Sequence, residues 1–311
     1  MPNLTTVILP AGLTGIPKDA FANSAKLATV KFGSADASNG GGSNPSGRAV
    51  TGIDNAITLP TGITSIGTNA FANTAATTVD LSKITATSFT TISDYVFKDM
   101  ASLAEVKLPA SITTINQSAF QNDAKLAKLS QDSPTTGGGS AQTRAENEAN
   151  TATFGKSLTS IGNNAFYGTG FTTVDLSQAA GTPASGGSGT QTPARTLSVG
   201  SGAFTNMAEL TTVKLPKDSN INPTYFGNPT TEGTTPKLTS IMYGDGTATA
   251  TATIGDATIS SPNFSKIQNQ TIQINSNTSS TINFTGGVFN GNSTMTKLML
   301  NVTQRNGNTS L

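Results

Sequence analysis

An apolar residue followed five positions later by phenylalanine recurs along this chain of 311 residues. Between these pairs lies a second element, L-x-x-V-x-L, and one complete unit runs for 23 residues from Leu103 to Lys125. The nine pairs are Ile16/Phe21, Ile66/Phe71, Ile92/Phe97, Ile115/Phe120, Ile161/Phe166, Val199/Phe204, Ile221/Phe226, Ile259/Phe264 and Phe284/Phe289. Self-similarity at such a period is the mark of a repeat array, which constrains the fold more than any other feature here.

A unit of 23 residues is too short to fold alone and buries its apolar side only against neighbouring units, which predicts a solenoid. In L-x-x-V-x-L, the alternation of apolar and polar positions predicts a short strand. The segment leading into each phenylalanine predicts a second extended piece, and the Asn-rich stretch beside Ala-Phe predicts a helical turn. We therefore predict a β-rich repeat solenoid of about nine coils with short strands and helical turns. The predicted core phenylalanines are Phe21, Phe71, Phe97, Phe120, Phe166, Phe204, Phe226, Phe264 and Phe289.

The unit L-x-x-V-x-L-P-x-x-I-T-x-I-x-x-x-A-F resembles the BspA-type, or Treponema pallidum-type, leucine-rich repeat. The resemblance runs from Leu4 to about Phe226 and weakens afterwards. It implies one leucine-rich repeat solenoid over residues 1–311, with regular repeats and Gly-rich insertions in 1–227 and degenerate Asn/Thr-rich β-solenoid coils in 228–311. The family often has cysteine three residues after the phenylalanine. This chain instead has Ser24, Thr74, Met100, Asp123, Thr169 and Met207 at that position.

The resemblance also implies a function, which the periodicity does not. Proteins of this family are bacterial, secreted or displayed on the cell surface, and are linked to adhesion and to protein binding. The implied partner is a protein or glycan on host or neighbouring cells, and the implied location is extracellular or at the cell surface. The first ten residues lack a basic stretch followed by an apolar core, so we expect no signal peptide within the chain. No capping unit precedes Leu4, which is typical of a fragment of a longer protein.

Composition narrows the possible chemistry. The chain has no Cys, His or Trp, so disulfides, thiolate or imidazole metal sites and a Ser-His-Asp triad are excluded, and we expect no cofactor and no metal. Charged residues are 11% of the chain and the net charge is +1, which disfavours binding to nucleic acid. No run of 18 apolar residues is present, so we expect no membrane insertion within the chain. The residues Gly155–Lys156–Ser157 resemble half of a P-loop, but Asn150 stands where its first glycine is required.

The strand residue between the inward valine and leucine should point outward and form a column along the array. In the order of the predicted coils the column is Ile8, Lys31, Asp80, Lys107, Ser130, Asp175, Lys214 and Met242. Its charged members are the first candidate partner-binding residues: Lys31, Asp80, Lys107, Asp175 and Lys214. A Thr-rich column should run beside it. The alternating charges contain no paired carboxylates of the kind that cleave glycosidic bonds. The column is either a recognition surface on the concave strand face or a solubilising face.

Four insertions interrupt the repeat, at about residues 33–56, 130–153, 177–195 and 244–253. All follow an L-x-x-V-x-L strand, so we expect them to leave the solenoid from one edge. The first three have similar Gly-rich sequences. They contain Arg48, Arg144 and Arg195, the remaining candidate partner-binding residues. The loops either present guanidinium groups to an acidic or glycan partner or are solvated spacers.

The sequence therefore favours a non-enzymatic bacterial cell-surface or secreted repeat protein. It would mediate protein binding or adhesion through its concave strand face and its insertion loops. Two alternatives stay open: a parallel β-solenoid enzyme that acts on polysaccharide, which would require clustered carboxylates in a groove, and a passive surface spacer.

Overall fold

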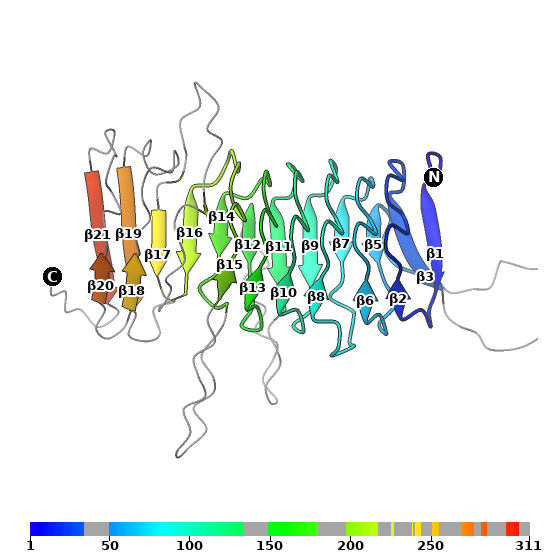
Figure 1. The fold of residues 1–311 in the computed structure, drawn as a ribbon, viewed down its shortest axis with the longest axis horizontal. Coiled ribbons are helices and arrows are strands. Elements are labelled where there is room, and N and C mark those ends of the chain that lie inside the picture. The colour runs from blue at the N-terminus through cyan, green and yellow to red at the C-terminus, as the bar shows by residue number, and fades with distance from the viewer. Residues whose placement is uncertain are drawn as a thin grey trace, which may run out of the picture.

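The computed structural model of the chain describes residues 1–33, 50–132, 149–179, 197–216, 225–226, 238, 240–243, 251–254, 269–276, 281–284 and 297–304. Consecutive repeats wind into a parallel β-solenoid, which confirms the predicted fold class (Figure 1). In the view of Figure 1 the coils follow one another in a nearly straight row.

One long sheet, which we call the main sheet, runs the length of the array and contains 13 strands. Twelve of them are parallel neighbours: β1 (Thr6–Pro10), β3 (Thr29–Gly33), β5 (Ala56–Thr58), β7 (Thr78–Asp80), β9 (Glu105–Leu108), β11 (Lys128–Gln131), β12 (Thr151–Thr153), β14 (Thr173–Asp175), β16 (Thr212–Leu215), β17 (Ser240–Tyr243), β19 (Asn269–Ser276) and β21 (Lys297–Gln304). The other, β4 (Val50–Thr51), pairs antiparallel with the end of β3. The predicted L-x-x-V-x-L strands all lie in this sheet.

A second row of two-residue strands lies on the opposite side of the coils. These are β2 (Gly15–Ile16), β6 (Ser65–Ile66), β8 (Thr91–Ile92), β10 (Thr114–Ile115), β13 (Ser160–Ile161) and β15 (Ser198–Val199). Further along, β18 (Thr251–Ile254) pairs with β20 (Thr281–Phe284). The described ranges thus form about six turns that have both kinds of strand, which is fewer than the nine coils predicted. The difference arises because the last three predicted repeats are not fully described: Ile221, Phe264 and Phe289 lie outside the described residues.

The core lies between the two rows of strands. Its main-sheet column joins Val30, Val79, Val106 and Val213 with their counterparts in other coils, and all four are fully buried. Each pairs in register with the equivalent residue of the next strand, as Val79 does with Val106. Because every coil buries its apolar residues against two neighbours, the sheet register and the core are fixed together.

The phenylalanines form a second, aromatic column behind the main sheet. Seven of the predicted nine are described, and all but the partly buried Phe21 are buried. Consecutive rings are stacked at centroid separations of 5.2 to 5.8 Å. The sequence order of the stack is Phe21, Phe71, Phe97, Phe120, Phe166, Phe204 and Phe226. Each coil is therefore joined to the next by an aromatic contact as well as by the sheet.

The segment around each phenylalanine, which we call the Phe turn, is not the helical turn that the sequence predicts. In six coils the residues two before and two after the phenylalanine have positive φ, between 52° and 73°. They are Asp19, Asn23, Asn69, Asn73, Tyr95, Asp99, Ser118, Asn122, Asn164, Gly168, Gly202 and Asn206. A right-handed helix cannot continue through left-handed residues, and Asn, Asp and Gly tolerate that conformation best. The Asn-rich composition therefore reflects left-handed backbone rather than a helix.

Hydrogen bonds in the Phe turns run between coils. The amide of Phe71 donates to the carbonyl of Val96 at 3.0 Å, and that of Phe120 donates to the carbonyl of Ala165 at 2.8 Å. The left-handed residues donate in the same way, as Asn73 does to Lys98 at 2.8 Å. The Phe turns thus form a third hydrogen-bonded side of the solenoid.

The first two insertions rejoin the solenoid at a place that the sequence did not reveal. Residues 34–49 connect β3 to β4 and then to β5, and residues 133–148 connect β11 to β12. Among the described residues, no second-row strand and no Phe turn falls between β3 and β5 or between β11 and β12. The third insertion, in contrast, connects β14 to the second-row strand β15. All three leave from the end of a main-sheet strand, as predicted, but they do not replace the same part of a coil.

Candidate binding face

The solvent-facing side of the main sheet, which we call the outer face, consists of two columns of side chains. The first column precedes the buried valine of each strand by one residue, and the second follows it by one residue. Because the strands are parallel and in register, equivalent side chains of neighbouring coils lie about 4.8 Å apart. Each coil therefore adds two side chains to the outer face, but those of Thr29, Ala56, Thr58 and Thr151 are buried.

The register gives the order of the second column, which contains the predicted charged residues. The sequence interpretation placed Asp80 next to Lys31, and Asp175 next to Ser130. The strands that follow the insertions lie between them. Thr58 pairs with Asp80, and Thr153 pairs with both Ser130 and Asp175. The pairing of Asp80 with Lys107 and of Asp175 with Lys214 is as predicted.

A sequence signal for the two missed strands was present. Asn55 and Asn150 are the residues directly before β5 and β12, and both have positive φ, of 58° and 64°. The carbonyl of Asn55 accepts hydrogen bonds from the amide and hydroxyl groups of Thr77, at 2.8 and 3.0 Å. The carbonyl of Asn150 accepts the same pair from Thr172, at 2.8 and 3.1 Å. The strings N-A-I-T-L from Asn55 and N-T-A-T-F from Asn150 thus each mark a return to the main sheet.

Asp80 and Asp175 end their strands and are not exposed members of the outer face. Their exposed fractions are 9% and 6%, so the prediction of an exposed column is wrong for these two residues. The Oδ1 atom of Asp80 accepts hydrogen bonds from the amide and hydroxyl groups of Ser82, at 3.1 and 2.7 Å. Asp175 accepts the same two bonds from Ser177, at 3.0 and 2.7 Å. Such local turns are a common use of aspartate at the end of a strand, and the shared string D-L-S was their sequence signal.

The lysines of the second column are partly exposed and have acidic neighbours. Lys31 forms an ion pair with Asp54 at 2.7 Å, and Gly52 lies against the Lys31 side chain. Lys214 forms an ion pair with Asp175 at 3.5 Å. These contacts hold both lysine side chains against the sheet at either end of the described outer face.

Among the outer-face side chains whose exposure is described, the most exposed charges lie on β9 and β11, near the middle of the sheet. Lys107 and Lys128 approach the same Glu105 Oε1 atom, at 3.9 and 3.0 Å. The two lysine side chains are each 40% exposed, whereas Glu105 is 26% exposed. We call these three residues the central charge cluster. It presents two ammonium groups around one carboxylate, a net positive arrangement that suits an anionic group of a partner.

Some threonine hydroxyl groups join neighbouring coils and others do not. Beside the main-sheet strands, Thr77, Thr172 and Thr211 donate to backbone carbonyls of the preceding coil. On the second row, Thr64, Thr113 and Thr159 donate to backbone carbonyls of the preceding coil, at 2.9 to 3.3 Å. On the outer face, Thr78 and Thr173 make no side-chain hydrogen bond within the described part of the chain. The hydroxyl groups of Thr64, Thr113 and Thr159 therefore join coils, whereas those of Thr78 and Thr173 remain for other partners. The hydroxyl group of Thr29, also in the first column of the outer face, accepts a hydrogen bond from the amide of Asn55 at 3.0 Å.

The remaining predicted residues are not described. Arg48, Arg144 and Arg195 fall within the insertions and lie outside the described residues, as do Phe264 and Phe289. Within the described ranges, no group of three or more acidic side chains is placed to hold a metal ion. No helix in that part of the chain is long and apolar enough to cross a membrane.

The sequence profile described as "BspA type Leucine rich repeat region" matches this chain in six copies. The matches cover residues 1–40, 52–137 and 143–182, which is more than half of the chain. A search of curated proteins finds no significant match.

A comparison with solved structures finds matches that align with most of this chain. A leucine-rich repeat protein from Bacteroides ovatus is 15% identical, with a TM-score of 0.45, and the alignment covers 94% of this chain and 65% of that protein. The pneumococcal vaccine antigen PcpA is 15% identical, with a TM-score of 0.40, covering 90% of this chain and 68% of PcpA. A leucine-rich cell surface protein from Faecalibacterium prausnitzii is 17% identical, with a TM-score of 0.26, covering 96% of this chain and 79% of that protein.

Proposed function

This chain belongs to the BspA-type leucine-rich repeat family, and from that premise we propose that it is a non-enzymatic bacterial protein that binds a macromolecular partner. We place it outside the cell or at the cell surface, where the partner is a protein or glycan of a host or neighbouring cell. We also propose that residues 1–227 and 228–311 are regular and degenerate parts of one solenoid. The continuation of the main sheet through β17, β19 and β21 supports this.

One observation carries the proposed binding role of the outer face. The hydroxyl groups of Thr64, Thr113 and Thr159 in the second row donate to backbone carbonyls, whereas those of Thr78 and Thr173 on the outer face do not. An array held together by its core, its Phe turns and its second row leaves the outer face available for contacts with a partner. The partly exposed central charge cluster lies in the middle of that face.

The use of Asp80 and Asp175 supports a non-enzymatic role. Each carboxylate is nearly buried and accepts hydrogen bonds from a serine two residues later. Neither is placed as a general acid or base facing a groove, which a polysaccharide-cleaving solenoid would require. The arginines of the insertions, Arg48, Arg144 and Arg195, remain a second proposed contact region.

The binding role can be tested on arrays of glycans and of extracellular-matrix proteins. Reversing the charge of both Lys107 and Lys128, by substitution with glutamate, is expected to weaken binding to any captured partner at least about tenfold, or about 1.4 kcal/mol. The matched control substitutes glutamate for Lys18 and Lys98, which lie on the Phe-turn side. The dissociation constants would be compared by surface plasmon resonance.

Unchanged affinity in the Lys107/Lys128 variant, or equal loss in the control, would contradict the outer face as the contact region. A variant with alanine at Arg48, Arg144 and Arg195 separates the two proposed regions. If only this second variant loses affinity, the partner contacts the insertions instead of the outer face. Release of reducing ends from a glycan on the array would contradict the non-enzymatic role.

A further inference from the structure

The position three residues after each phenylalanine points into the core. It is buried in all six described coils that contain it, and its occupants are Ser24, Thr74, Met100, Asp123, Thr169 and Met207. Asp123 is the one carboxylate among them and is fully buried. A carboxylate in such a position costs free energy unless its oxygen atoms are hydrogen-bonded or the group takes up a proton.

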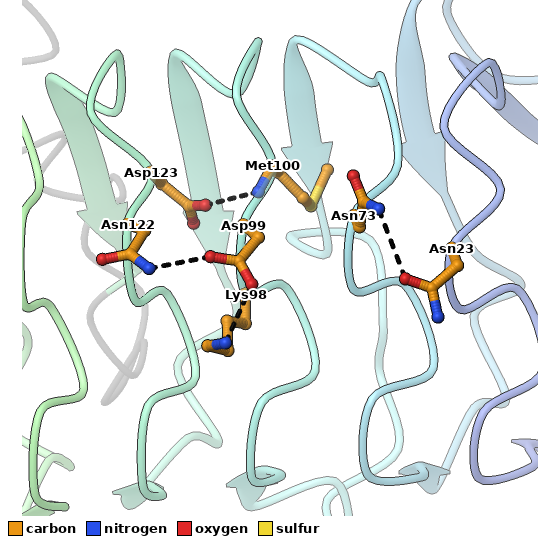
Figure 2. Close-up of polar contacts among 7 residues, drawn as sticks. All are labelled: Asn23, Asn73, Lys98, Asp99, Met100, Asn122 and Asp123. Atoms are coloured by element: carbon orange, nitrogen blue, oxygen red, sulfur yellow. Dashed lines mark hydrogen bonds and ion pairs between the residues drawn. The ribbon is translucent and has the colours of Figure 1, made fainter.

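The hydrogen bonds of Asp123 satisfy only one of its two oxygen atoms. Figure 2 shows its Oδ1 atom accepting a hydrogen bond from the amide of Met100 in the preceding coil, at 2.7 Å. The buried Oδ2 atom has no hydrogen-bond partner in the described part of the chain. The contact joins the Phe turns of two neighbouring coils, so a change at Asp123 alters the junction between them.

Comparison with two other coils shows what the Oδ2 atom lacks. The hydroxyl groups of Thr74 and Thr169 each donate to the carbonyl of the phenylalanine three residues earlier, both at 2.9 Å. An ionised carboxylate has no hydrogen to donate, whereas a protonated carboxyl group has one. A proton on Asp123 would therefore give this coil the donor that threonine provides elsewhere.

The charged groups around Asp123 do not compensate an ionised carboxylate. In the preceding coil Asp99 carries a charge that acts on Asp123, and it accepts hydrogen bonds from Lys98 and Asn122, both at 2.8 Å (Figure 2). Lys98 is thus already paired with Asp99. In the following coil residues 163–170 contain no Asp, Glu, Lys or Arg, and Tyr167 is their single titratable residue.

We propose that Asp123 is a proton-dependent switch, whose neutral form locks the junction between the coils of Phe97 and Phe120 and whose ionised form loosens it. Burial, the largest influence, raises the pKa of Asp123 well above its ordinary value, and the charge of Asp99 acts in the same direction. The hydrogen bond from Met100 opposes them. The geometry and the electrostatics therefore agree on a neutral carboxyl group in the folded state.

The direction of the pH dependence follows from proton linkage. Because the pKa of Asp123 is higher in the folded than in the unfolded state, the folded state holds the proton over the interval between the two values. The stability that this group contributes is present in full below its pKa in the unfolded state, near 3.8. It is lost as the pH rises toward the pKa of the group in the folded state. Within that interval the opening constant of the junction rises about tenfold per pH unit.

Asp99 acts in the opposite sense. Burial alone would raise its pKa, but the hydrogen bonds from Lys98 and Asn122, with the charge of Lys98, hold the pKa below its ordinary value. Its contribution to stability is present above the unfolded value and is lost as the pH falls through the folded value. The pH dependence of the whole protein mixes both groups, so the difference between variants is the useful quantity.

Hydrogen exchange measured by mass spectrometry tests the switch on the full chain. In the native protein the protection factor of peptides containing Met100 is expected to fall as the pH rises from 5 to 8. In Asp123→Thr it should stay level over this range and exceed the native value at pH 8. Equal pH slopes in the two proteins would overturn the proposal.

The reverse substitution supplies a matched control at an equivalent position. Thr169→Asp places a carboxyl group at the same point of another Phe turn, and its own junction should gain the pH slope that Asp123→Thr loses. If Asp123→Thr does not fold, Asp123→Asn gives the same comparison, because an amide keeps the acceptor and cannot ionise. A level profile for Thr169→Asp in a folded protein would count against the switch.

Discussion

Replacing Phe120 by alanine is expected to lower the free energy of unfolding by about 3–5 kcal/mol. Phe120 is fully buried and stacks on Phe97 at 5.4 Å and on Phe166 at 5.2 Å. Its removal leaves a cavity in the middle of the array and breaks two ring contacts at once. In a solenoid each coil contacts only its neighbours, so this loss falls on the two junctions that hold the halves of the array together.

Chemical denaturation followed by circular dichroism measures this effect. The native protein should unfold in a cooperative transition, whereas Phe120→Ala should unfold at lower denaturant and over a broader or divided transition. The matched control is Phe21→Ala, because Phe21 is partly buried and has one stacking partner, Phe71 at 5.3 Å. Equal losses in the two variants would show that the aromatic column does not couple the coils.

The second large effect is expected at Gly162, on the second row directly after β13. A Cβ atom there would lie 2.6 Å from the backbone nitrogen of Gln117 and 2.7 Å from the carbonyl carbon of Asn116. Real Cβ atoms do not approach backbone this closely, so Gly162→Ala must push two coils apart. Overpacking of this kind costs about 1–3 kcal/mol. The measurement is again the free energy of unfolding by chemical denaturation.

Gly62 provides the control for this substitution, since a Cβ atom there would meet nothing within 4 Å. Gly62→Ala is expected to leave stability unchanged or to raise it by about 0.4–1 kcal/mol, because alanine restricts the unfolded chain. If Gly162→Ala and Gly62→Ala were equally well tolerated, the result would contradict close packing of the backbone between the coils of Ile115 and Ile161.

Sequence reasoning recovered those parts of the fold that depend on apolar spacing. The Leu and Val of each strand and the phenylalanine of each Phe turn face the core, since burial of apolar surface drives folding. Their residue types and regular spacing are enough to predict this burial from the sequence. The order of Asp80 before Lys107, and of Asp175 before Lys214, followed from the same spacing. These features need no knowledge of the backbone conformation.

Features that depend on backbone conformation were harder to predict. A short Asn-rich stretch with one buried phenylalanine fits a helical turn and a left-handed turn equally well by periodicity. The choice is made by inter-coil hydrogen bonds such as that from Phe71 to Val96, which no local pattern reports. The strands β5 and β12 lack the leucine that begins a standard unit, so the L-x-x-V-x-L pattern does not predict them.

The candidate site was predicted in position but not in exposure. Strand alternation placed Asp80 and Asp175 on the outer face, where each could have been a recognition group. Their carboxylates instead accept hydrogen bonds from Ser82 and Ser177, two residues later in the chain. Strand alternation does not predict such local bonds between a side chain and its neighbours. Lys107, whose contact with Glu105 is long at 3.9 Å, keeps the exposure expected of it.

The continuity of the outer face across the insertions can be measured directly with disulfides, since the native chain has no cysteine. Ser130 and Thr153 are paired on adjacent strands, whereas Asp175 is one strand further from Ser130. Adjacent strands lie about 4.8 Å apart, within reach of a disulfide, and alternate strands lie about 9.6 Å apart, beyond it. Under mild oxidation the S130C/T153C variant should form an intramolecular disulfide and the S130C/D175C variant should remain reduced. The opposite result would contradict the account, because it would place the strand after the insertion outside the main sheet and break the proposed binding face in two.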